Sequence, residues 1–198
     1  DKLCLYWYNI FKNLNTVANN DATYKSSPQA QLDSIFEIRS ELPLINNSDI
    51  YLNTLIPKVS FRINPGKMKN YYNEVKKITV NNIYSIDRIG LDDAFESGQS
   101  LTLGFNYRKE NKEISSKYFD FELATVIRDK KNDKIPKTST INNKYSNLFG
   151  SASYNFIDNF KLRYNFSLDN NLEAIEYSSV TADFAIANFK TKIDFIEE

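Results

Sequence analysis

Four acidic residues between positions 87 and 96 are the first candidates for chemistry in this sequence. Asp87, Asp92, Asp93 and Glu96 lie close together, with Arg88 among them. Clustered carboxylates are ligands for hard cations, and a pair of carboxylates can exchange protons in general acid–base catalysis. The competing interpretation is an acidic loop that Arg88 partly neutralises. We favour this second interpretation, and no metal site is predicted.

The composition argues against an enzyme. The 198-residue chain has no histidine, which removes the commonest general base and metal ligand. No nucleophile or defined pocket accompanies the carboxylates, so neither a catalytic residue nor a cofactor is predicted. The single cysteine, Cys4, cannot form an internal disulfide. The 25 basic and 25 acidic residues balance, which gives no field that would favour nucleic acid as a partner.

Arg88 is better explained as part of an ion network that fixes a long loop. Its predicted partners are Asp92 and Glu96. Gly90 and Gly98 would allow tight turns or close backbone approach in the same loop. If so, Arg88→Ala should loosen the loop.

The elements that hold this loop are predicted strands. From Phe160 to Asp169, apolar and polar residues alternate, which indicates a strand with one apolar and one polar face. Alternation of this kind predicts nine strands, and no helix of more than two turns is convincing. Their approximate ranges are 3–13, 34–43, 51–63, 99–109, 117–128, 147–157, 159–169, 173–183 and 188–197.

The lengths of the connections distinguish two architectures for these strands, an outer-membrane barrel and a soluble sandwich. The long connections are 14–33, 64–98 and 129–146, and the short ones include 44–50, 110–116 and Asp158. In an up-and-down sheet every second connection falls on the same side, so the long loops share one side. Outer-membrane barrels have long extracellular loops and short periplasmic turns, whereas a soluble sandwich has no reason to sort its loops. A short connection near Asn170 and Asn171 departs from the rule.

The predicted fold is therefore all-β: an antiparallel up-and-down transmembrane β-barrel segment, about nine strands of a larger barrel. Most predicted strands reach the 9–11 residues that span a bilayer. The charged strand faces would line the lumen. Aromatic residues near strand ends would form interfacial girdles, although they are also good strand formers. They are Tyr6, Trp7, Tyr8, Tyr107, Tyr118, Tyr154 and Tyr177.

The stretch NNIYSIDRIGLDDAFESGQSLTLGFNY, residues 81–107, resembles a segment of the LptD family of lipopolysaccharide-assembly proteins. There it closes a large loop and enters the next strand. The residues that carry the resemblance are Asn82, Tyr84, Arg88, Gly90, Asp92, Glu96 and Gly98. Residues 54–70 and 123–156 look like flanking strands and loops of that family. The resemblance covers roughly residues 34–198 and places the chain in the middle of the barrel.

The resemblance implies a non-enzymatic function, the insertion of lipopolysaccharide into the outer leaflet of a Gram-negative outer membrane. It also implies three partners besides outer-membrane lipid: lipopolysaccharide, an LptE-like plug lipoprotein and an LptA-like periplasmic bridge. The family's periplasmic jellyroll, gate strands and disulfide cysteines are not found in this sequence. Because the sequence begins at Asp1 and ends at Glu198 within a strand pattern, we expect residues 1–198 to be an internal fragment of a single barrel domain.

Four basic residues on the predicted lumen face are candidate contacts for the phosphates and acidic sugars of lipopolysaccharide: Arg108, Arg128, Lys161 and Arg163. The alternative is ordinary wetting of the lumen, with these charges balanced by nearby acidic residues. Two alternatives to the family function also stand. One is another outer-membrane barrel, such as a porin or a receptor for solute uptake. The other, from a different class, is a soluble β-sandwich binding module.

Overall fold

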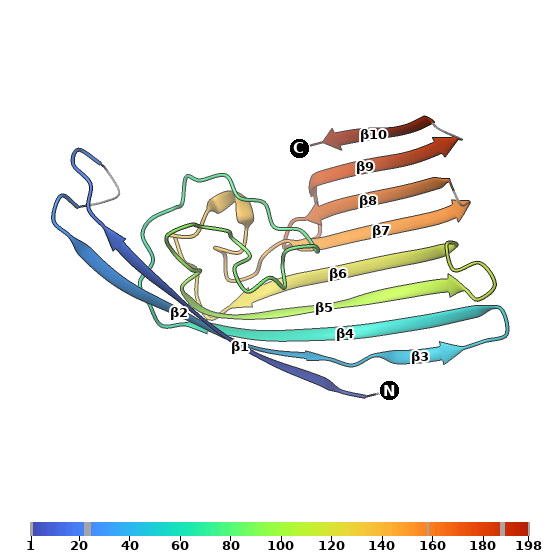
Figure 1. Cartoon of the computed structure of the whole chain (residues 1–198), viewed down its shortest axis with the longest axis horizontal. Helices are drawn as coiled ribbons and strands as arrows, with labels where there is room; N and C mark the ends of the chain where they lie inside the picture. Colours follow the sequence, from blue (N-terminus) through green and yellow to red (C-terminus); the bar gives the residue numbers. More distant parts are fainter. Residues whose placement is uncertain (1, 22–24, 158, 187–188, 198) are drawn as a thin grey trace.

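One antiparallel sheet contains every strand of the structure (Figure 1). The computed structural model describes residues 2–21, 25–157, 159–186 and 189–197. The strands are β1 (Cys4–Thr16), β2 (Gln29–Glu41), β3 (Leu44–Asn47), β4 (Tyr51–Asn64), β5 (Gly98–Asn111), β6 (Tyr118–Arg128), β7 (Leu148–Ile157), β8 (Phe160–Leu168), β9 (Ile175–Ile186) and β10 (Phe189–Glu197). A single 3₁₀ turn, η1 (Lys137–Ser139), lies between β6 and β7.

The sheet has the order β1-β2-β4-β5-β6-β7-β8-β9-β10, with β3 paired to β4. Each of these neighbours is antiparallel to the next, so the predicted all-β, up-and-down fold is confirmed. The sheet is open, because β1 and β10 form its two edges and do not pair with each other. The predicted turn at Asp158 lies outside the described residues.

The strand missed by the sequence is β3, which lies inside the predicted short loop 44–50. β2 pairs with β4 through Glu41, and β3 pairs with β4 from Leu44 onward, so β2 and β3 run in the same direction along one neighbour. Pro43 stands between them and has no N–H to donate to the ladder. They are therefore two parts of one interrupted strand. The predicted loop 14–33 was also too long, since β1 ends at Thr16 and β2 begins at Gln29.

The connections are sorted by length between the two ends of the sheet, as predicted. The segments after β1, β4, β6 and β8 lie at one end, here called the loop end, and include the long stretches 65–97 and 129–147. The connections at the other end, the turn end, are short. Figure 1 shows the two long stretches gathered against the sheet at the loop end instead of extending away from it.

The two faces of the sheet differ sharply in polarity. On β5, Leu101, Leu103 and Phe105 share one face, and their cross-strand neighbours on β4 and β6 continue it with Val59, Phe61, Leu123 and other apolar residues. Many large apolar side chains on this outer face are exposed, including Trp7 at 75%. An apolar surface of this extent needs a non-aqueous environment.

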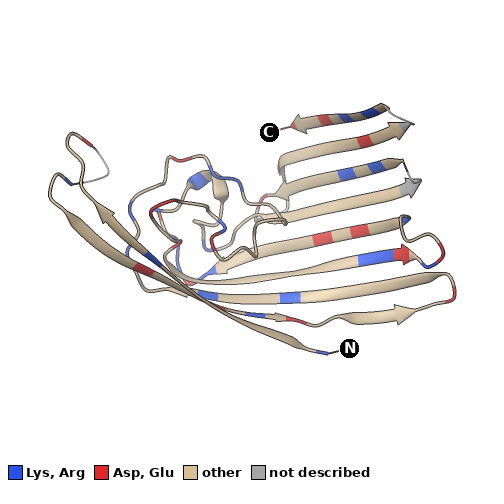
Figure 2. Ribbon diagram, viewed as in Figure 1, with Lys and Arg blue, Asp and Glu red and all other residues tan. Residues whose placement is uncertain are grey.

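The inner face carries the charged residues, and the only described hydrophobic core lies against it. Figure 2 shows Lys, Arg, Asp or Glu along β4, β6 and β8 and near the end of β5. The core packs residues of the two long stretches on Ala124, Val126 and Phe149 of the inner face. Among the described residues, no helix is long and apolar enough to cross a membrane.

Candidate functional site

Residues 65–97 and 129–147 together form a cap over the inner face at the loop end. Many of their apolar side chains are buried, and Ile83, Ile135 and Ile141 have no exposed surface. The two stretches are also joined by backbone hydrogen bonds, since the Tyr71 N–H donates to the Lys134 carbonyl at 2.9 Å. The cap is therefore a packed layer on the sheet and not a pair of solvated loops.

Small inner-face residues of β5 provide the surface on which the cap packs. Gly104 lies beneath the ring of Tyr84, and a Cβ atom there would come within 2.5 Å of the Tyr84 hydroxyl oxygen. The basic side chains of Arg39 and Lys58 lie near the same ring, at 5.7 and 5.8 Å from its centroid. Burial raises the pKa of the Tyr84 phenol. The aromatic residue of the family-like motif is thus a neutral contact between cap and wall.

Glu96 accepts hydrogen bonds at the centre of a buried ion network. Both oxygens of its carboxylate bond Arg88, at 2.6 Å from Nε and 2.6 Å from Nη2, and Arg128 also donates to it. Arg88 then donates to the hydroxyls of Ser100 and Thr102 at 3.0 and 2.9 Å. These contacts join the cap to β5 and β6 through charge-assisted hydrogen bonds.

The electrostatics of Glu96 follow from this arrangement. Burial by itself would raise the pKa of the carboxyl, but Arg88, Arg128 and Arg62 oppose it and hold the pKa at about 2. Glu96 is therefore ionised at neutral pH. It is therefore not a proton donor at that pH.

A second carboxylate, Glu37 on β2, extends the network across the sheet. Arg62 on β4 donates to it at 2.8 Å and Arg39 at 2.6 Å. Both arginines also reach the cap, since Arg62 donates to the Ser85 carbonyl at 2.8 Å and Arg39 donates to the Tyr84 carbonyl. The arginine side chains of the wall under the cap therefore donate hydrogen bonds to carbonyl groups of the cap backbone.

Lys12 makes the corresponding contact from β1. Its ammonium donates to the Leu91 carbonyl at 2.6 Å and lies 3.4 Å from the Asp87 carboxylate. It also lies 4.3 Å from the centroid of the Phe95 ring. The cap is therefore tied to strands from β1 to β6.

The four clustered acidic residues do not converge on one point. Asp87 pairs with Lys12, Asp93 pairs with Lys69 at 3.1 Å, and Glu96 pairs with arginines. The prediction that Asp92 joins Arg88 and Glu96 was wrong, since Asp92 is exposed and the described ion pairs do not include it. Its position after the buried Leu91 turns it outward. Within the described ranges, no group of three or more acidic or cysteine side chains could hold a metal ion.

The remaining motif residues shape the cap backbone. The Asn82 side chain accepts from the Thr79 N–H at 2.8 Å and donates to the Lys77 carbonyl at 3.0 Å, which closes a turn. Gly90 and Gly98 have φ values of 63° and 90°, a region that residues with a side chain rarely adopt. Gly98 also lies where the cap enters β5, and a Cβ there would come within 2.9 Å of Arg128.

The motif residues thus lie in one structure, a cap that is attached to a barrel-like wall. The family model described as LptD, LPS transport system D, matches residues 6–193, nearly the whole chain. The chain belongs to the LptD family. This match begins earlier than the resemblance read from residues 34–198. Among curated proteins, none matches the chain.

Membership of the LptD family fixes the function at a coarse level. The family takes part in lipopolysaccharide transport and assembly at the outer membrane of Gram-negative bacteria, and it is not an enzyme family. The family role also implies binding of lipopolysaccharide and work with other components of the Lpt system.

The four predicted lumen residues fall into two environments in this LptD wall. Arg128 is only 2% exposed, because the cap covers it, so the expectation that it faces an open lumen was wrong. Arg108 is partly exposed on β5, with Glu110 at 2.9 Å and Asp120 at 3.8 Å. Lys161 and Arg163 on β8 are partly exposed on the inner face, opposite Asp183 and Thr181 of β9.

Sequence reasoning missed Glu37, Arg62 and Lys12 as parts of the cap attachment. The signal that could have found them is a charged residue at an inner-face position of its strand. Glu37 stands directly opposite Arg62 in the register of β2 and β4, and opposite charges in that position stabilise a pair. The residues can be read from the sequence, but the strand register that pairs them cannot.

Proposed function

We propose that this chain forms wall and cap in the middle of an LptD barrel that inserts lipopolysaccharide into the outer leaflet. In this role the polar inner face gives the sugars a hydrated path, while the acyl chains remain with lipid. The cap would close the lumen at the end where the long loops lie. The chain would itself carry out no catalysis.

One observation carries the proposal: a single sheet separates an apolar outer face from a charged inner face, and a packed cap covers only part of the inner face. A soluble β-sandwich would bury its apolar face against a second sheet. Here the outer face keeps Trp7, Phe36 and Phe61 exposed while Arg62 and Glu37 are buried inside. Apolar residues on the outside and charged residues on the inside are the arrangement expected of a wall between lipid and water.

The orientation of the wall follows from the sorting of its loops. We place the long connections, predicted at 14–33, 64–98 and 129–146, outside the cell, and the short turns in the periplasm. The cap would then lie at the extracellular mouth. This orientation is the one that an exit into the outer leaflet requires.

The open part of the inner face provides the contacts for the substrate. Arg108, Lys161 and Arg163 are the basic side chains that we assign to the phosphates and acidic sugars of lipopolysaccharide. They remain partly exposed, and Figure 2 shows the basic positions of β8 beyond the area that the cap covers. Arg128 is not included, since its guanidinium is already paired with Glu96.

The same proposal assigns two protein partners. An LptE-like lipoprotein would occupy the lumen beside the uncovered inner face, and an LptA-like bridge would deliver lipopolysaccharide from the periplasm. Support for both comes from membership of the LptD family, whose members function within a transport system.

The test is depletion of the complete protein in its native cell, followed by measurement of lipopolysaccharide on the cell surface. We expect surface lipopolysaccharide to fall while other outer-membrane barrels still assemble. Re-expression of the complete wild-type protein should restore it. Normal surface lipopolysaccharide after full depletion would overturn the insertion function and favour transport of small solutes instead.

A further inference from the structure

A cavity of about 410 Å³ lies at the turn end of the sheet, where β4, β5, β6 and β7 meet. Its lining includes Tyr51, Lys109, Lys117, Phe119 and Tyr154. In the register of the sheet, Lys109 stands opposite Phe119, and Phe119 stands opposite Tyr154. These three side chains share the outer face with Phe105 and Phe121. Two other lining residues, Tyr118 and Asn155, belong to the inner face, so the cavity lies at the rim of the sheet, with most of its lining on the apolar side.

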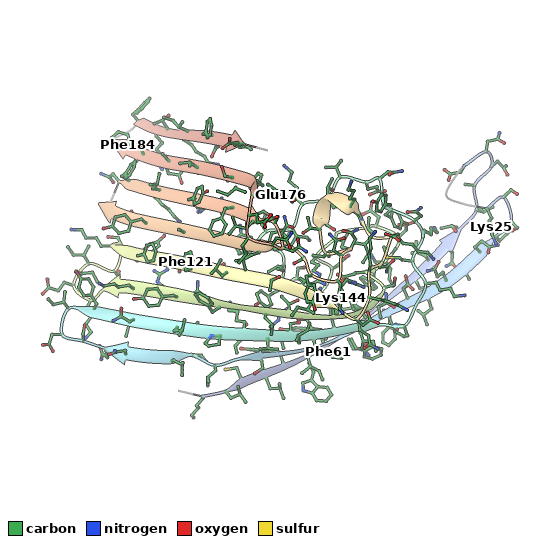
Figure 3. The ribbon with its side chains drawn as sticks, turned by 180° about the vertical axis from the view of Figure 1, so that it is seen from behind. Lys25, Phe61, Phe121, Lys144, Glu176 and Phe184 are labelled. Atoms are coloured by element: carbon green, nitrogen blue, oxygen red, sulfur yellow. The ribbon has the colours of Figure 1, made fainter. Side chains whose placement is uncertain are left out.

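The aromatic side chains give this cavity a defined wall. The rings of Phe119 and Tyr154 meet edge to face, with centroids 6.4 Å apart, and Phe119 stacks on Phe121 at 6.5 Å. Phe121 in turn contacts Phe105 at 6.0 Å. Figure 3 labels Phe121 on β6, in the part of the strand that lies away from the cap. An apolar strip therefore leads from the cavity toward the middle of the wall.

Two lysines add positive charge to the cavity. The Lys109 ammonium lies 4.2 Å from the centroid of the Tyr51 ring, another lining residue. Lys117, the residue before β6, lines the same cavity. Among the ion pairs found in the described residues, neither ammonium has a carboxylate partner. Two cations without a carboxylate partner beside an aromatic surface are suited to bind an anion.

We propose that this cavity binds the phosphate head group of a membrane glycerophospholipid. The ammonium groups of Lys109 and Lys117 would contact the phosphate as point charges, and one acyl chain would lie along Phe119, Phe121 and Phe105. Aromatic and basic residues gather at membrane interfaces because one end of each is apolar and the other polar. The occupant is a phospholipid of the leaflet at the turn end, which is the periplasmic leaflet in the orientation proposed above.

A lipid titration on the complete protein in its purified complex tests the site. The probe is dioleoylphosphatidylglycerol added to the complex in detergent, with bound lipid counted by native mass spectrometry. Lys109→Gln and Lys117→Gln are each expected to weaken binding about fivefold. Dioleoylglycerol, which lacks the phosphate, should bind wild-type protein and both variants equally.

The matched control is Lys112→Gln. Lys112 is an exposed lysine in the turn between β5 and β6, outside the cavity lining, and its loss should leave lipid binding unchanged. Migration of unheated protein on a gel shows that each barrel remains folded. Equal phosphatidylglycerol binding by wild-type protein and both cavity variants would overturn the proposal, as would occupation of the site by lipopolysaccharide instead. Neither result depends on whether lipopolysaccharide insertion itself is correct.

Discussion

The capped and open parts of the inner face have similar residues in opposite environments. Under the cap, Glu37, Arg62 and Arg128 are buried to 2% exposure or less, and each has a partner of opposite charge. On the open part, Arg108 keeps 38% of its side chain exposed beside Asp120. Charge on a lumen-facing position therefore has two meanings. Beneath the cap it joins the cap to the wall, and beyond the cap it stays partly exposed.

This difference has an energetic consequence. A buried charge that loses its partner is left without water or a counter-ion, which costs several kcal/mol. A partly exposed charge that loses its partner is solvated again at little cost. Variants of the capped part should therefore change stability, and variants of the open part should change transport.

The largest expected effect comes from Glu96→Ala. It leaves Arg88 and Arg128 buried without their carboxylate, so the cap should lose about 3–5 kcal/mol of stability. Limited trypsin digestion of the complete protein should show faster cleavage within residues 65–97, and cells should become more sensitive to vancomycin. Arg88→Ala should act in the same direction.

The control for that experiment is Asp92→Ala, four positions away and exposed. It should digest like wild-type protein. If Asp92→Ala and Glu96→Ala were equally sensitive to trypsin, the buried network would not hold the cap.

Acid should reproduce part of the same effect. The pKa of Glu96 lies at about 2 in the folded protein against 4.5 for the ordinary group, so its ionised form stabilises the fold by about 3 kcal/mol. A lowered pKa gives stability that is complete above about pH 4.5 and is lost as pH falls toward 2. Pepsin cleavage of the cap, normalised to an unfolded reference peptide, should rise across this interval. In Glu96→Gln this rise should be much smaller; an identical rise would assign the acid sensitivity to other groups.

Gly104→Ala should have an intermediate effect. Its Cβ would meet the Tyr84 hydroxyl at 2.5 Å and the Leu123 carbonyl at 2.3 Å, so the cap and β6 must both shift. Overpacking of this kind costs about 1–3 kcal/mol. Thermal unfolding of the purified protein measures the loss. Combining it with Tyr84→Phe, which removes one of the three clashing atoms, should recover part of that loss. Strict additivity of the two changes would show that Tyr84 does not contact Gly104.

The smallest effect on stability belongs to the open part. Lys161→Gln with Arg163→Gln should change the unfolding free energy by less than about 0.5 kcal/mol, since both side chains are partly exposed. In a strain that depends on this protein, however, the double variant should slow the arrival of new lipopolysaccharide at the surface. Lys130→Gln, an exposed change on the cap, should leave both properties unchanged. Normal lipopolysaccharide arrival in the double variant would show that these charges only wet the lumen.

The sequence predicted the strands and their sorting because these depend on local patterns. Alternation of apolar and polar residues has the period of a strand, and it located nine of the ten described strands within a few residues. The exception, β3, is short and follows Pro43, so its pairing with β4 is set by a neighbour distant in the chain and not by its own pattern. Likewise, Gly90 and Gly98 could be read as turn residues because their conformation is a local property.

What the sequence by itself determined is thus the wall: its strands, its two faces, the side of its long loops and the family motif between Asn82 and Gly98. What only the tertiary structure decided is which charges lie under the cap. Arg88 and Glu96 are eight positions apart, but Arg62 and Arg128 reach Glu96 from strands that the chain visits before and after residues 65–97. Asp92 has the same chemistry as Glu96 and points to solvent. Pairing across that distance depends on strand register and on how the loop packs back, and neither is encoded in the spacing of the residues.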